Sequence, residues 1–153
     1  MAEHQFEKGV CYCFSSDECQ KTIYGADRIF SRVHPRKVAK EYEVEFKKII
    51  WLSTTSDPET AVINPNDLAK ISALMEGMEG KDFHFGTGVF SYLSKANGFN
   101  QTLGLFQMIA EKTAKKNYIV TAHIDPKAFT EKDYCDIIQT VPFIEMEKLG
   151  EKA

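Results

Sequence analysis

Two runs of nearly continuous apolar residues constrain the fold of this chain more than any other feature. Residues 49–52 read Ile-Ile-Trp-Leu, and residues 118–124 read Tyr-Ile-Val-Thr-Ala-His-Ile. A strand without polar–apolar alternation has to be covered on both faces, which is typical of parallel sheets flanked by helices. Shorter β-rich segments occupy residues 9–14, 29–32 and 83–90, and residues 141–146 are predicted as an edge strand.

Helix-like segments alternate with these strands. Four residues or pairs have the side chains that commonly precede or begin a helix: Ser15 with Glu18, Pro35, Asn64 with Pro65, and Thr130. Residues 91–96 are predicted as a helical turn, and an apolar stripe that starts at Phe99 predicts a longer helix after it. The alternation predicts an α/β fold, a three-layer sandwich of the RecA-like or Rossmann-like kind. Its mostly parallel open sheet would have about five strands, with helices on both faces.

The length of 153 residues predicts one α/β domain over residues 1–153, with polar tails at 1–8 and 147–153. The net charge is −3 and no basic stripe is present, so we expect no nucleic acid partner. No apolar run reaches the ~20 residues that span a bilayer, and the start lacks an apolar signal core. We therefore expect a cytoplasmic protein that does not bind membranes and keeps its cysteines reduced.

The phosphate-binding motifs that often accompany this fold are incomplete. Gly80-Lys81 is the one Gly-Lys pair, but Asp82 follows where a hydroxyl would hold magnesium, and Met75 replaces the first glycine of the P-loop. Residues 86–91, Gly-Thr-Gly-Val-Phe-Ser, only approach the dinucleotide fingerprint, because Ser91 takes the place of its third glycine. We expect a degenerate P-loop and no cofactor.

Three cysteines near the start of the chain form half of a metal-site pattern. Cys11 and Cys13 face the same side of a predicted strand, and Cys19 lies on the predicted helix after it. Zinc sites usually combine two such pairs, so we interpret these residues as buried free thiols and expect no metal. A thiol or metal-binding protein built on Cys11, Cys13 and Cys19 stays an alternative.

No catalytic residue emerges from the sequence. The nucleophile-elbow pattern G-x-S-x-G is missing, so we expect that the protein is not an enzyme. His123 and Asp125 lie on the same side of a strand end, which suggests a proton relay but is more typical of a polar strand end that meets water.

Polar residues at the predicted strand ends suggest where a ligand would bind. In open α/β sheets, ligands bind beyond the carboxyl ends of the strands. The candidates there are Arg32, His34, Ser53, Thr54, His123 and Asp125. Their charge and hydrogen-bond donors suit a small anion.

An ordered set of short motifs resembles a known family. The motifs are Ile29 to Pro35, Tyr42-Glu43-Val44, Ile50 to Ser53, Ile63 to Leu68, Tyr92-Leu93, Asn97-Gly98-Phe99 and Asp125 to Phe129. Over about residues 8–145 they resemble the archaeal family catalogued as Domain of Unknown Function 835. The resemblance implies an archaeal protein related to RecA-type ATPases without their phosphate loop, and the company of sensory and signalling modules. Many members carry an Asp-Gly-Ile-Glu-Tyr-Leu stretch, but residues 88–93 here lack both acids, so the resemblance implies no magnesium role for this chain.

These observations favour a non-enzymatic protein-interaction or signalling module of unknown specificity, with a protein partner or a homodimer. The alternatives are a small-anion or nucleotide-binding protein that uses the strand-end pocket, and the thiol or metal-binding protein described above.

Overall fold

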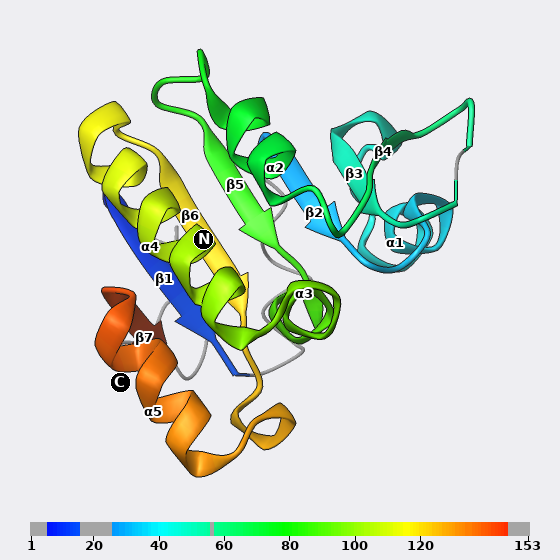
Figure 1. Ribbon diagram of the computed structural model, residues 1–153. Coiled ribbons are helices and arrows are strands. Elements are labelled where there is room, and N and C mark those ends of the chain that lie inside the picture. The colour runs from blue at the N-terminus through cyan, green and yellow to red at the C-terminus, as the bar shows by residue number, and fades with distance from the viewer. Residues whose placement is uncertain (1–5, 16–25, 56, 147–153) are drawn as a thin grey trace.

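The computed structural model describes residues 6–15, 26–55 and 57–146 (Figure 1). Its seven strands form one sheet in the order β4-β3-β2-β5-β6-β1-β7, and every neighbouring pair is parallel. The strands are β1 (Val10–Phe14), β2 (Arg28–Ser31), β3 (Ile49–Leu52), β4 (Ala61–Ile63), β5 (Asp82–Phe85), β6 (Ile119–His123) and β7 (Phe143–Met146). The predicted α/β fold is confirmed, with seven strands rather than about five.

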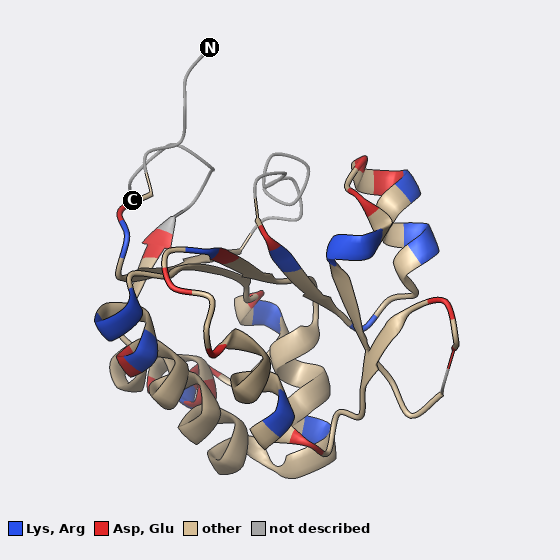
Figure 2. Cartoon of the chain, turned by 90° about the horizontal axis from the view of Figure 1, so that it is seen from above, with Lys and Arg blue, Asp and Glu red and all other residues tan. Residues whose placement is uncertain are grey.

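Within the described ranges, five α-helices and two 3-10 helices connect the strands. They are α1 (Pro35–Tyr42), η2 (Phe46–Lys48), α2 (Leu68–Met75), α3 (Val89–Asn97), α4 (Phe99–Lys116), η3 (Pro126–Ala128) and α5 (Glu131–Thr140). Viewed from above, α1 lies on one side of the sheet, and α2, α3, α4 and α5 lie on the other (Figure 2). None of the helices formed by the described residues is both long and apolar enough to cross a membrane.

Alternation along the strands divides the interior into two apolar clusters. In β1, Cys11 and Cys13 belong to the larger cluster beneath α4 and α5, whereas Tyr12 and Phe14 belong to the smaller cluster that includes Val38 of α1. Successive side chains of a strand point to opposite faces, so one strand contributes to both clusters. Strands β1, β2, β5 and β6 form the middle of the sheet, and nearly all of their side chains are buried.

Several predicted helix boundaries differ from those in the structure. Asn64 does not cap α2; its side chain accepts a hydrogen bond from the backbone of Asn66 at 2.9 Å within a turn. Asp67 caps α2 instead, by accepting from the backbone N–H of Lys70. Thr130 caps α5 as predicted. The helix predicted to begin at Ser15 falls mostly outside the described residues.

The connections diverge between the adjacent strands β2 and β5. The chain leaves β2 through α1 toward β3, on one side of the sheet, and leaves β5 through α3 and α4 toward β6, on the other side (Figures 1 and 2). Where neighbouring parallel strands send their connections in opposite directions, a crevice opens at their carboxyl ends. This topology places the candidate site next to residues 32 and 86–88.

Candidate functional site

A cavity of about 240 Å³ opens at the carboxyl ends of β5 and β6, beside the residue that follows β2. Its walls come from three segments that are distant in sequence. The lining residues are Arg32, Thr87, Gly88, Phe90, Ser91, His123, Ile124, Asp125, Ala128 and Phe129. Among the residues that the sequence singled out, Arg32, His123 and Asp125 are thus brought together.

The exposed side chain of Arg32 lies across Gly88 at the start of α3. A Cβ added to Gly88 would lie 2.9 Å from the Nη1 atom of Arg32 and 3.2 Å from its Cδ. The Arg32 guanidinium carbon also lies 5.7 Å from the centre of the Tyr92 ring, within range of a cation–π contact. No ion pair connects this guanidinium to an acidic side chain among the described residues.

The turn at residues 86–88 delivers the start of α3 to the same place. Gly86 donates its N–H to the carbonyl of Phe30 at 2.9 Å, and Gly88 adopts a φ of 74°, a conformation that favours glycine. Residues 86–90 were predicted as part of a strand, but the strand ends at Phe85 because this turn redirects the chain into a helix. Helix α3 has no capping side chain and no acidic residue in its first turn, so no side chain of the helix itself offsets the partial positive charge of its N-terminus beside the cavity.

His123 and Asp125 form the opposite wall. His123 is buried at the end of β6, and its proximity contributes to the low pKa of His84 on the neighbouring strand. Asp125 accepts a hydrogen bond from the backbone N–H of Lys127 at 2.9 Å through Oδ1, and so caps η3. That cap gives Asp125 a structural role beside the proton relay considered from the sequence.

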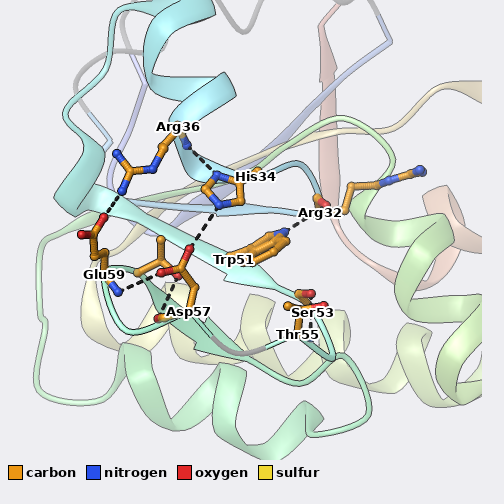
Figure 3. A network of polar contacts seen from close by, with 9 residues as sticks. Arg32, His34, Arg36, Trp51, Ser53, Thr55, Asp57 and Glu59 are labelled. Atoms are coloured by element: carbon orange, nitrogen blue, oxygen red, sulfur yellow. Dashed lines mark hydrogen bonds and ion pairs between the residues drawn. The ribbon is translucent and has the colours of Figure 1, made fainter.

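Of the other three predicted residues, His34 and Ser53 make polar contacts with residues of the β3–β4 loop (Figure 3), and Thr54 lies in that loop. His34 accepts from the backbone N–H of Arg36 at 3.1 Å through Nδ1, and its Nε2 lies 3.3 Å from Asp57. Ser53 is buried and accepts from the backbone N–H of Thr55 at 3.0 Å, whereas Thr54 is exposed. His34, Ser53 and Thr54 are not among the residues that line the cavity.

Trp51 links this network to the cavity. Its Nε1 donates to the backbone carbonyl of Arg32 at 3.3 Å, and its ring centre lies 4.6 Å from that of His34. Figure 3 shows the Arg32 side chain extending away from His34 and Trp51. The network therefore holds the backbone of Arg32 while its guanidinium reaches toward α3.

Sequence reasoning missed the aromatic part of the cavity wall, which Phe90 of α3 and Phe129 after η3 provide. Phe90 is buried and its ring centre lies 5.7 Å from that of Phe129, in an edge-to-face arrangement. The signal for this wall was the pair of glycines at 86 and 88, which precede a helix as in phosphate-binding turns.

The cysteine cluster lies elsewhere. Cys11 and Cys13 are buried, and burial raises the pKa of the Cys11 thiol to about 11 and that of the Cys13 thiol to about 12. Thiols with raised pKa values stay protonated and react slowly at neutral pH. Cys19 lies outside the described residues, so a metal site built on Cys11, Cys13 and Cys19 stays the alternative that it was in the sequence.

The comparisons with known proteins identify a family. The family model described as "Protein of unknown function (DUF835)" matches residues 21–140. No curated protein and no solved structure matches the chain. The matched range includes every residue that lines the cavity.

Proposed function

This chain belongs to the DUF835 family of proteins of unknown function, and we propose that it is a non-enzymatic domain that binds a small anion in the cavity beside Arg32. This proposal combines two functions considered from the sequence, the small-anion-binding protein and the signalling or interaction module. Binding of the anion would regulate the signalling or interaction role. The archaeal origin and RecA-like ancestry that the resemblance implied remain predictions.

The observation that carries the proposal is the position of the Arg32 guanidinium over the start of α3. The first turn of a helix carries a partial positive charge and unsatisfied N–H groups, and Arg32 adds a full positive charge beside it. Like charges repel, and the described residues offer no acidic partner to the guanidinium. A bound anion would neutralise both and accept hydrogen bonds from both.

The size of the cavity favours a small ligand over a nucleotide. Its volume of about 240 Å³ is below the roughly 300 Å³ at which pockets for drug-sized molecules begin. A carboxylate or phosphate group with a short body fits this space better than a nucleoside triphosphate does. This agrees with the incomplete P-loop in the sequence.

Thermal unfolding in phosphate, sulfate or acetate, against chloride at equal ionic strength, tests the proposal. We expect at least one of these anions to stabilise the protein by roughly 1.4 kcal/mol at ten times its Kd, a Tm increase of about 3–5 °C. Arg32→Gln should abolish the increase, because it removes the charge and the forked donors. Gly88→Ala should weaken it too, because a Cβ there meets the guanidinium and the φ of 74° is unfavourable for alanine.

Arg36→Gln is the matched control. Arg36 is an exposed arginine of α1 that pairs with Glu59 and does not line the cavity. The proposal fails if no anion stabilises the wild-type protein, or if Arg36→Gln removes the stabilisation as completely as Arg32→Gln does.

A second candidate function is self-association into a homodimer through the surface of α2 and α4. A mostly apolar groove between α2 and α4 is lined by Leu68, Ala69, Asn100, Gln101, Gly104, Leu105 and Met108. Met108 is 39% exposed, and a Cβ added to Gly104 would meet nothing within 4 Å. Two copies of α4 packed antiparallel would place Met108 of each over Gly104 of the other, a self-complementary arrangement expected of a twofold interface.

Light scattering coupled to size-exclusion chromatography, over a series of increasing protein concentrations, tests this candidate. We expect a concentration-dependent dimer that Met108→Glu converts to a monomer, because the variant places two carboxylates in an apolar contact. Gln107→Glu should leave the dimer intact, because Gln107 is exposed on the same helix outside the groove. A wild-type protein that is monomeric at all concentrations eliminates this second candidate.

A further inference from the structure

The cavity that holds Arg32 also carries an acidic side chain on another wall. Asp125 uses Oδ1 to cap η3, and its other carboxylate oxygen has no hydrogen-bond partner among the described residues. Arg32 and Asp125 both line the cavity, yet no ion pair within 4.0 Å connects them. The cavity is therefore lined by a positive and a negative group that form no ion pair with each other.

The space between these two charges is bordered by apolar side chains. Phe90 of α3 and Phe129, which follows η3, both line the cavity, with ring centres 5.7 Å apart. A ligand body of a few CH₂ groups would contact the aromatic rings, and its transfer from water to this apolar surface is favourable. Because Arg32 and Asp125 are anchored on different segments, the spacing of a ligand's two ends would decide how well it fits.

We propose that the natural ligand is a small zwitterion, with its anionic group at Arg32 and an ammonium group at Asp125. This inference rests on the proposed function, since it assigns the second half of the same ligand. A guanidinium binds a carboxylate or phosphate through paired N–H donors, and an ammonium offers three donors to a carboxylate oxygen. A ligand with anionic groups at both ends would instead bring like charges together at Asp125.

Calorimetric titration with three matched sets of compounds tests the inference. The sets are ω-amino carboxylates (β-alanine, γ-aminobutyrate, δ-aminovalerate), alkyl carboxylates of the same lengths, and dicarboxylates of the same lengths. At constant ionic strength we expect one amino carboxylate to bind at least tenfold more tightly than its alkyl counterpart. The dicarboxylates should bind most weakly of all.

Asp125→Asn is the decisive variant. Asparagine keeps a side-chain oxygen that accepts from the Lys127 N–H and so retains the cap, but it lacks the negative charge. The tenfold preference for the ammonium group should disappear while the alkyl carboxylates bind as before. Asp133→Asn is the control, because Asp133 lies in the first turn of α5 outside the cavity, and it should keep the preference. Thermal unfolding of the same samples verifies that each variant is folded.

The outcomes separate this inference from the proposed function. If dicarboxylates bind the wild-type protein as tightly as amino carboxylates, or if Asp125→Asn keeps the preference, the zwitterion is wrong, and Arg32-dependent binding of simple anions still supports the proposed function. If none of the three sets binds and no inorganic anion stabilises the protein, the proposed function is wrong as well.

Discussion

Lowering the pH from 7 to 5 is expected to reduce the free energy of unfolding by about 2 kcal/mol through His84 alone. His84 lies on the central strand β5, is 2% exposed, and its Nδ1 lies 2.8 Å from the hydroxyl of Thr121. Burial, with a smaller contribution from His123, lowers the pKa of His84 from 6.5 to about 3.

The sign of this pH dependence follows from proton uptake. Below pH 6.5 the unfolded chain binds a proton at His84, whereas the folded chain stays neutral there down to a pH of about 3. The unfolded state therefore binds more protons throughout this window, and stability is lost as the pH falls. Above pH 6.5 both states are neutral at His84, so its contribution to the pH dependence vanishes.

Urea unfolding at pH 7, 6 and 5 measures the effect, and His84→Gln isolates it. The substitution lowers stability at every pH by disturbing a buried position, so the slope against pH is the informative quantity. The slope of the variant should be shallower by about 1 kcal/mol per pH unit below pH 6. An identical slope in both proteins would show that His84 is not the group that titrates on unfolding.

Phe85→Ala is expected to lower the free energy of unfolding by about 3–5 kcal/mol. Phe85 is 1% exposed at the end of β5. Its ring is stacked on that of Phe30, with centres 4.7 Å apart, and meets that of Phe106 edge to face, with centres 4.9 Å apart. Truncation leaves a cavity that those two rings line and that the sheet holds open. Because Gly86 follows directly, the same change should also loosen the turn beside Arg32.

Urea unfolding at pH 7 tests this prediction, with Ile144→Ala as the control. Ile144 is 44% exposed on the edge strand β7, so its truncation should cost less than about 1 kcal/mol. A loss below about 1 kcal/mol for Phe85→Ala would contradict the packing described for the central strands.

The sequence predicted the sheet well because its signal is strong along the buried strands. The unbroken apolar run at residues 49–52 predicted a strand covered on both faces, and β3 lies inside the sheet between β2 and β4 with three of its four residues buried. β4 was not predicted, because its three residues, Ala-Val-Ile, form too short a segment to show any periodicity. Asn64 and Asp67 are both good N-caps, and local propensity cannot choose between two such residues three positions apart.

The candidate site was predicted in part, and strand order explains which part. Sequence patterns place polar side chains at the carboxyl edge of the sheet but do not say which strands are neighbours. β2 lies between β3 and β5, so Arg32 reaches toward the side of β5 while His34 and Ser53 lie on the side of β3. The wall formed by Phe90 was missed because a valine and a phenylalanine after a glycine have the composition of a strand, although they begin a helix here.

The position of β1 has a consequence for biosynthesis. Val10 pairs with Ile119 of β6, and Cys11 pairs with Phe143 of β7. Strand β1 is translated before β6 and β7, so it cannot complete its pairing until both have been synthesised. Until then its apolar side chains and backbone groups lack their final neighbours, which leaves the nascent chain dependent on non-local contacts and exposed to aggregation. Strands β2, β3, β4 and β5 pair with one another and are all translated before β6, so they can assemble first and then receive β6, β1 and β7.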